Sequence, residues 1–369
     1  MKISFPYMGA TLVYGKLFEL LGHQVIMPPR PTRHTIDLGV KYAPEFACFP
    51  LKVILGTYLE AIELGADTLV TTGGNGPCRA GYYGEVHKKI IENLGIDVEV
   101  IVLDEPKRDW RGFLQKLLRL KGENSWREVY QIIQICFRLA QSVDQVERQI
   151  TCQRAYVLDK PELNRLHAQI SAEYQQVKTV ADIEAVEQRA FAALKRLPVQ
   201  VPPADQRIKI GIIGEIFVVI EASINYELEE LLNSYGVETE RSHYISDWAG
   251  ETLRLCPDTQ EKAEDILKKG EPYIEIIIGG HAKQSVGHIV DYKERGFDGV
   301  IHVKPFGCLP EIVVQSMLDK LSETLDIPII SLSIDEQMAE ANTITRIEAF
   351  LELIKRRKAA FNAAERKVC

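Results

Sequence analysis

The chain has 369 residues, of which 46% are apolar and 26% charged, and its 52 acidic and 44 basic side chains leave a net charge of −8 at pH 7. This length predicts two domains, because single hydrophobic cores rarely grow beyond about 250–300 residues. The acidic balance argues against a nucleic acid partner, since phosphates attract an excess of cations. No apolar run is long enough to span a bilayer and the first residues show no signal-peptide pattern, so we expect a cytoplasmic protein.

The first hundred residues alternate strand and helix signals, as expected of a doubly wound parallel sheet. Strands are predicted at 2–6, 23–27, 67–72 and 97–103, and helices at 12–21, 51–64 and 85–94. Between them, residues 30–50 have the composition of a polar loop, and residues 73–84 that of an irregular glycine-rich turn.

The composition then changes to long helical patterns, and residues 198–203, rich in Val, Pro and Gln, have the character of a linker. Helices are predicted at 114–120, 126–151 and, as one or two helices, 161–197. Beyond the linker the α/β alternation resumes, with strands predicted at 208–213, 238–242, 274–278, 299–303 and 328–333, and helices at 225–235, 261–269, 288–295, 311–325 and 342–362. We therefore predict an α/β protein with two Rossmann-like or flavodoxin-like parallel-sheet domains, residues 1–105 and 207–369, and a helical region with its linker at residues 106–206.

Three of the seven cysteines lie in short loops beside proline or glycine: Phe46-Ala47-Cys48-Phe49-Pro50, Gly76-Pro77-Cys78-Arg79 and Phe306-Gly307-Cys308-Leu309-Pro310. Such loops are rigid and leave space beside the sulfur, because proline fixes φ and glycine permits close approach. Three thiolates are one short of the four that usually hold an iron–sulfur cubane, so one iron would stay open. The alternative is three unrelated buried thiols, since cysteine often behaves as a small apolar residue.

The predicted elements place all three cysteines near the start of a helix, where backbone donors favour the thiolate. Cys78 and Cys308 lie in turns that lead from a strand to a helix, the edge at which ligands usually bind in such sheets. The remaining cysteines, which we take as nonligands, are Cys136, Cys152, Cys256 and Cys369. Charged residues that flank the three loops and are candidates to tune the site are Arg33, His34, Lys52, Arg79 and Glu85, although ordinary ion pairs are an alternative role for each.

Two glycine-rich loops after predicted strands offer backbone N–H groups that suit a phosphate, at Gly73-Gly74-Asn75-Gly76-Pro77 and Gly279-Gly280-His281. Neither matches a P-loop or a dinucleotide fingerprint, and Gly214-Glu215 lacks the further glycines of the latter. His281 and Ser285 are candidates to cap a helix or to contact a ligand. A Ser-His hydrolase is disfavoured because no carboxylate stands at a suitable spacing.

The sequence resembles the acyl-CoA dehydratase activase-related family, also described as CoA protein activase. In the first half the resemblance rests on Tyr14-Gly15-Lys16-Leu17-Phe18-Glu19, Cys48-Phe49-Pro50-Leu51-Lys52, Gly73-Gly74-Asn75-Gly76-Pro77-Cys78-Arg79 and Gly81-Tyr82-Tyr83. In the second half it rests on Gly279-Gly280-His281, Gly296-Phe297-Asp298-Gly299, Pro305-Phe306-Gly307-Cys308-Leu309-Pro310-Glu311 and Thr345-Arg346-Ile347-Glu348-Ala349-Phe350, and these motifs also resemble the cluster-bearing subunits of 2-hydroxyacyl-CoA dehydratases and benzoyl-CoA reductases.

The resemblance implies one [4Fe–4S] cluster held by Cys48, Cys78 and Cys308, low-potential one-electron reduction of a small substrate or electron transfer, and an ATP-hydrolysing activator protein as the electron donor. A homodimer is an expectation by analogy. The alternatives are a double-cubane reductase, which would need further cysteine ligands, and a noncatalytic scaffold or metal-binding component, with zinc as a candidate metal because it accepts three protein ligands plus water. No acyl-CoA pocket is recognisable in the sequence, so dehydratase activity is not implied with the cluster.

Overall fold

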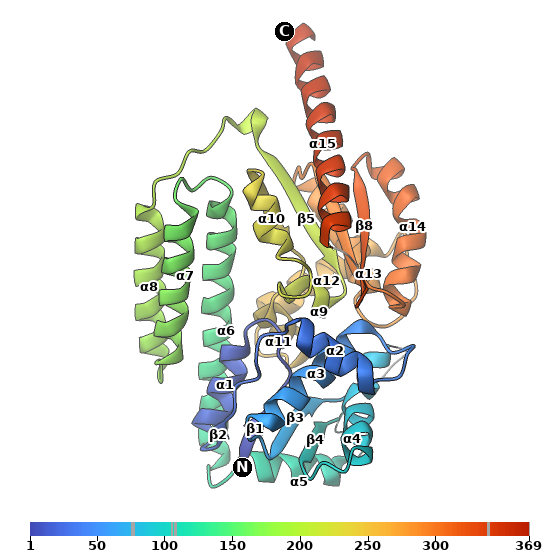
Figure 1. Cartoon of the computed structure of the whole chain (residues 1–369). Coiled ribbons are helices and arrows are strands. Elements are labelled where there is room, and N and C mark those ends of the chain that lie inside the picture. The colour runs from blue at the N-terminus through green and yellow to red at the C-terminus, as the bar shows by residue number, and fades with distance from the viewer. Residues whose placement is uncertain (75–77, 105, 107–108, 338–339, 369) are drawn as a thin grey trace. The chain divides into compact units, whose positions relative to one another are not determined.

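Figure 1 shows the computed structural model, which describes the chain except for residues 75–77, 105, 107–108, 338–339 and 369. The chain forms two compact units: unit 1 comprises Met1–Val143 and Ser171–Glu187, and unit 2 comprises Asp144–Ile170 and Gln188–Cys369. Each unit contains one four-stranded parallel sheet, which confirms the predicted α/β class with two parallel-sheet domains. The predicted division into residues 1–105, 106–206 and 207–369 stays a prediction.

The sheet of unit 1 has the strand order β2-β1-β3-β4. Its strands are β1 (Lys2–Ser4), β2 (Gln24–Val25), β3 (Thr68–Thr72) and β4 (Glu99–Leu103), and its helices before residue 105 are α1 (Thr11–Leu20), α2 (Arg33–Tyr42), α3 (Phe49–Glu63), the short 3-10 helix η1 (Arg79–Tyr82) and α4 (Tyr83–Asn93). Helix α3 is buried almost throughout from Phe49 to Leu59. A helix that is apolar on all sides is stable only inside a core, so α3 anchors the loops at its ends.

The predicted polar loop at residues 30–50 is wrong in part, because it contains α2. This helix begins with a capping box in which the backbone N–H of Thr35 donates to Thr32 and that of Thr32 donates to the Thr35 hydroxyl. Few of its side chains are buried, so it lacks the apolar periodicity by which a helix is recognised in a sequence. The Thr32-x-x-Thr35 spacing is a variant of the capping-box pattern, in which Thr35 takes the place of the usual Glu or Gln. It is the local sequence feature that indicates the start of α2.

Helix α2 packs against α3 through two glycines that allow the backbones to touch. A Cβ atom built on Gly39 would lie 1.8 Å from the Lys52 carbonyl oxygen, and one on Gly56 would lie 1.9 Å from the Thr35 carbonyl oxygen. Both distances are impossible for real atoms, so only glycine fits at either position. The loop that carries Cys48 connects these two helices, and their close packing therefore fixes both of its ends.

We expect Gly39→Ala to lower the free energy of unfolding by about 1–3 kcal/mol, because the added methyl group forces α2 away from α3. Thermal unfolding followed by circular dichroism measures the change. Val40→Ala, on the exposed side of the same helix, is the matched control and should leave the melting temperature nearly unchanged. Equal effects of the two substitutions would show that α2 is not held by this contact.

Four helices follow β4 and account for the helical region predicted from the sequence: α5 (Trp110–Leu120), α6 (Trp126–Arg154), α7 (Lys160–Gln175) and α8 (Val180–Arg196). The last three run side by side in Figure 1. Within unit 1 the Ser142 hydroxyl of α6 lies 2.6 Å from the Tyr174 hydroxyl of α7, and Arg138 of α6 donates to Glu187 of α8 at 2.9 Å. Among the described residues no helix is both long and apolar enough to cross a membrane.

The sheet of unit 2 has the strand order β6-β5-β7-β8. Its strands are β5 (Ile208–Gly214), β6 (Val237–Arg241), β7 (Gly299–Pro305) and β8 (Ile329–Ile334). The remaining helices of unit 2 are η2 (Ala204–Gln206), α9 (Ile216–Ile220), α10 (Leu228–Ser234), α11 (Ile245–Thr252), α12 (Pro257–Gly270), α13 (Ala282–Glu294), α14 (Leu309–Leu325) and α15 (Glu340–Val368).

Helices cover both faces of this sheet. Buried side chains of α13 and α14 pack with Val300 of β7. Its neighbour Gly299 faces α15 instead, where an added Cβ would lie 2.6 Å from Ile354. Because successive strand residues face opposite sides, α15 covers the opposite face of the sheet from α13 and α14.

The strand predicted at residues 274–278 is wrong, because this segment is a connection between α12 and α13 that pairs with no described strand. Ile274 is buried with α13 and α14, whereas Ile276 and Ile277 are 69% and 78% exposed. A short apolar run does not by itself identify a strand, because burial and pairing are decided by the rest of the fold.

Candidate functional site

All three predicted cysteines occupy the position immediately before a helix. Cys48 precedes α3, Cys78 precedes η1, and Cys308 precedes α14. In α3 and α14, proline follows within the first two positions, which suits a helix start because proline lacks the N–H that would go unpaired there. The sequence-based placement of these residues at helix starts is thus correct.

The two cysteine loops of unit 1 are joined by a hydrogen bond. Arg79, next to Cys78, donates through Nη1 to the carbonyl oxygen of Phe46, two residues before Cys48, at 2.9 Å. Cys48 is buried, whereas Cys78 is partly exposed. The predicted flanking residue Arg79 therefore has a definite role, which is to hold one cysteine loop against the other.

A buried histidine fixes the helix that follows Cys48. The Nε2 atom of His87 in α4 lies 2.9 Å from the carbonyl oxygen of Leu51, in the first turn of α3. Burial lowers the pKa of His87 to about 4, so the ring is neutral and donates this hydrogen bond through its single N–H. The other flanking residues differ in setting: Lys52 is buried, Arg33 pairs with Asp37 on the surface, and His34 and Glu85 are exposed.

In unit 2, Cys308 lies at the carboxyl end of β7. The turn before it uses Gly307 at a φ of 74°, a conformation that glycine adopts without strain, and the Cys308 N–H donates to the carbonyl oxygen of Pro305 at 3.1 Å. Lys304, at the same end of β7, is buried, and this burial lowers its pKa while Cys308 and Glu311 oppose the shift. Cys308 is therefore buried near the ionisable side chains of Lys304 and Glu311.

A buried hydrogen-bond network lies behind this turn. Glu311, in the first turn of α14, is 1% exposed and accepts from His302 Nε2 at 2.9 Å and from the Ser285 hydroxyl at 3.2 Å. The other ring nitrogen of His302, Nδ1, lies 2.9 Å from the hydroxyl of Ser331 on β8. Ser285, which we had expected to cap a helix or contact a ligand, instead donates to this carboxylate. The members of this network are far apart in the chain, so no local sequence pattern predicts it.

A second acid, of intermediate exposure, lies at the end of β5. Gly214 has a φ of +135°, and a Cβ there would lie 1.8 Å from the Val303 carbonyl oxygen, so glycine is required where the chain leaves the sheet. The next residue, Glu215, accepts from the Val218 N–H at 3.1 Å. Burial raises the pKa of Glu215 from 4.5 to about 7, and the nearby Glu311 adds to this shift against the backbone donors of α9. Glu215 can therefore hold or release a proton near neutral pH.

We expect Glu215→Gln to stabilise the protein at pH 8 by roughly 3 kcal/mol and at pH 5 by less than about 1 kcal/mol. Between about pH 4.5 and 7 the unfolded chain loses the Glu215 proton before the folded chain does, so stability falls as the pH rises through this range. Glutamine stays neutral at every pH, so the variant avoids the free-energy cost of an ionised Glu215 in this setting. Urea unfolding at the two pH values measures the difference, with Glu323→Gln on the exposed side of α14 as control. A pH-independent effect of Glu215→Gln would contradict the assigned shift.

Among the remaining cysteines, Cys256 shares a feature of the predicted set, because it is the residue before α12 and is followed by Pro257. The polar sequence around Cys256 predicts a nonligand. Cys136 is buried within α6, and burial raises its pKa to about 12, which fits a packing role. Cys152 is exposed near the end of α6, and Cys369 lies outside the described residues.

Within the described part of the chain, no three His, Cys, Asp or Glu side chains are arranged as a group able to hold a metal ion. Cys48 and Cys78 belong to unit 1 and Cys308 belongs to unit 2. Of the two glycine-rich loops, the first has residues 75–77 outside the described residues, and its Gly73 packs so that a Cβ would meet Asp104 at 1.8 Å. In the second, His281 precedes α13, but its side chain makes no capping hydrogen bond. Phosphate binding at these loops stays a prediction.

Comparison with protein families extends the resemblance found in the motifs. A family model described as 2-hydroxyglutaryl-CoA dehydratase, D-component, matches residues 15–354, nearly the whole chain. The chain belongs to this family. The D-component match includes all three predicted cysteines and every described strand except β1, and it places the chain in the 2-hydroxyacyl-CoA dehydratase superfamily. No curated protein matches the chain.

Proposed function

We propose that this member of the D-component family is an iron–sulfur protein that holds one [4Fe–4S] cluster through Cys48, Cys78 and Cys308. When bound, such a cluster supplies single electrons at low potential, and with three protein ligands one of its irons stays open to a small substrate or ligand. The chain would serve as the reductase-type or dehydratase-type component of a 2-hydroxyacyl-CoA dehydratase system. Family membership over nearly the whole chain is the observation that carries this proposal.

The chemistry of the three residues fits this cofactor. Each cysteine directly precedes a helix, where backbone N–H groups and the helix dipole stabilise negative charge on sulfur. Arg79 holds the Cys48 and Cys78 loops together through its bond to Phe46, which keeps two of the proposed ligands in adjacent loops. The third proposed ligand, Cys308, is itself buried, as are Lys304 and Glu311.

The remaining parts of the proposal follow from the motifs. We propose that the chain belongs to the activase-related branch of the superfamily, that an ATP-hydrolysing activator protein supplies its electrons, and that the chain works as a homodimer on a small substrate. Thiolate ligands persist in a reducing compartment, which supports a cytoplasmic location.

Anaerobic reconstitution tests the cluster directly. Protein reconstituted with iron and sulfide should contain about four of each per chain and give an electron paramagnetic resonance signal after reduction. A stoichiometric zinc ion in place of iron would refute the cluster and support the metal-binding scaffold. About eight irons per chain would favour the double-cubane alternative, for which Cys256, placed before α12 like the proposed ligands, is the candidate for an additional ligand.

A further inference from the structure

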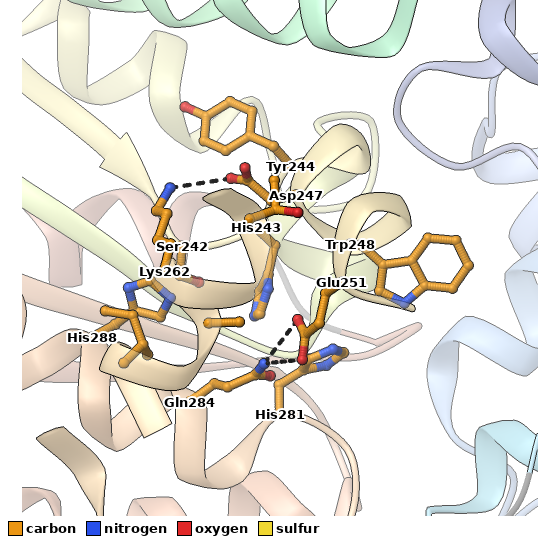
Figure 2. A pocket seen from close by; sticks show the side chains of 13 residues that line it. Ser242, His243, Tyr244, Asp247, Trp248, Glu251, Lys262, His281, Gln284 and His288 are labelled. Carbon is orange, nitrogen blue, oxygen red and sulfur yellow. Dashed lines mark hydrogen bonds and ion pairs between the residues drawn. The ribbon is translucent and has the colours of Figure 1, made fainter. Parts of the chain in front are cut away.

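Unit 2 contains a small pocket that the proposed cluster does not use. It lies among α11, α12, α13 and the segment that follows β6, and its volume is about 40 Å³. Figure 2 shows its side chains, with His243 pointing toward Glu251 and His281. Helices α12 and α13 form its walls at close range, because a Cβ on Gly287 would lie 1.9 Å from the Ile266 carbonyl oxygen. The pocket is therefore bounded by backbones that cannot separate without loss of packing.

Three neutral imidazoles face this pocket. Burial lowers the pKa of His243 and His281, and it lowers that of His288 to about 4, so none of the rings carries a charge at neutral pH. The ring centroid of His243 lies 4.5 Å from that of His281 and 6.3 Å from that of His288. His243 Nε2 lies 3.1 Å from the Gly214 carbonyl oxygen, to which it donates, so its Nδ1 remains an acceptor.

Two polar atoms of the lining are buried without a hydrogen-bond partner. They are the hydroxyl oxygen of Ser242, a residue only 9% exposed, and the Nδ1 atom of His288. An unpaired buried polar atom costs about 1–3 kcal/mol, which makes such atoms uncommon unless something binds them. Both residues line the same pocket.

The pocket also holds a carboxylate that no cation neutralises within the described chain. Both oxygens of Glu251 accept from the neutral side-chain amide of Gln284 at 3.2 Å, and burial raises the pKa of Glu251. Lys262, the lysine in the lining of this pocket, donates to Asp247 at 3.3 Å instead. Asp247 also accepts from Arg148 at 2.7 Å, so this aspartate is already well neutralised. The negative charge that remains in the pocket is that of Glu251.

We propose that this pocket binds a small primary amine as its ammonium ion. An ammonium group has three N–H donors and no acceptor, which matches a carboxylate, neutral imidazole nitrogens and a serine oxygen. The volume accommodates about two to four heavy atoms, because one water needs at least about 10–15 Å³ measured in this way. An anion is disfavoured because the lining is rich in acceptors and its lysine is paired. The inference does not depend on the three cysteines or on a cluster.

Titration of the full-length protein with methylammonium chloride, followed by calorimetry and by the imidazole resonances of the three histidines, tests this site. We expect saturable binding that shifts these resonances. Glu251→Gln should weaken binding about tenfold or more, because a charge-assisted bond is lost, and Ser242→Ala should weaken it about threefold. Lys262→Met should leave affinity unchanged or raise it, since the competing ammonium of the chain is removed.

Glu261→Gln is the matched control, because it removes the same charge from the exposed side of α12 and does not line the pocket. Unchanged thermal unfolding of each variant confirms that its fold is retained, and Ser242→Ala serves as the second variant if Glu251→Gln unfolds.

Three kinds of result would overturn the proposal. The first is absence of saturable methylammonium binding, or equal weakening of that binding by Glu251→Gln and Glu261→Gln. Displacement of methylammonium by stoichiometric Zn²⁺ would assign a metal instead. Much tighter binding of Nα-acetyl-lysine amide would assign a lysine of a partner protein, and would likewise overturn it.

Discussion

Replacement of Cys48, Cys78 or Cys308 with alanine, one at a time, is expected to remove most of the iron from the reconstituted protein and to abolish its electron paramagnetic resonance signal. With three protein ligands on one cluster, loss of any one leaves two irons without a thiolate. Alanine is preferable to serine in this experiment, because a serine oxygen can itself bind iron. Iron and sulfide analysis after anaerobic gel filtration measures the effect.

Cys136→Ala is the control for this series. Its thiol is buried in α6 with a pKa raised to about 12, so it should keep the full iron content even if the protein is somewhat less stable. Cys256→Ala separates the single-cluster proposal from the alternative, because that residue also directly precedes a helix. Full iron in this variant supports three ligands, whereas partial loss would add Cys256 to the ligand set. Retention of iron in any of the three proposed ligand variants would exclude that cysteine as a ligand.

The strands and the cysteine turns were accessible from sequence because their signals are local. Apolar runs such as Ile208–Gly214 and Gly299–Pro305 are bounded by glycine or proline and alternate with helical patterns, which is enough to predict a parallel sheet. The position of Cys308 before a helix follows from Pro310 in the same way. Local patterns of this kind do not depend on the rest of the fold.

Features that depend on contacts between distant segments were missed or wrong. Helix α2 is defined by a capping box and by glycine contacts with α3, neither of which produces an apolar stripe. The run at residues 274–278 is as apolar as a strand, yet it pairs with no strand among the described residues. The raised pKa of Glu215 and the partners of Glu311 arise from burial beneath other elements, and sequence spacing contains no information on them.

The buried carboxylate of Glu311 provides the largest expected effect on stability. Glu311→Ala should lower the free energy of unfolding by roughly 3 kcal/mol, because it leaves the His302 N–H and the Ser285 hydroxyl buried without their acceptor, each at a cost of about 1–3 kcal/mol. The carboxylate also lies in the first turn of α14, where it interacts favourably with the helix dipole. Urea unfolding at pH 7, followed by near-ultraviolet circular dichroism, measures the loss.

Two further variants separate hydrogen bonding from charge. Glu311→Gln keeps an acceptor oxygen of the same shape, so it should cost only about 1 kcal/mol if the hydrogen bonds matter more than the charge. Glu323→Ala removes a glutamate from the exposed side of the same helix and should change stability by less than about 0.5 kcal/mol. The free energy of unfolding could instead fall as much in Glu311→Gln as in Glu311→Ala. That result would show that the negative charge of Glu311, which interacts with the buried Lys304, stabilises unit 2.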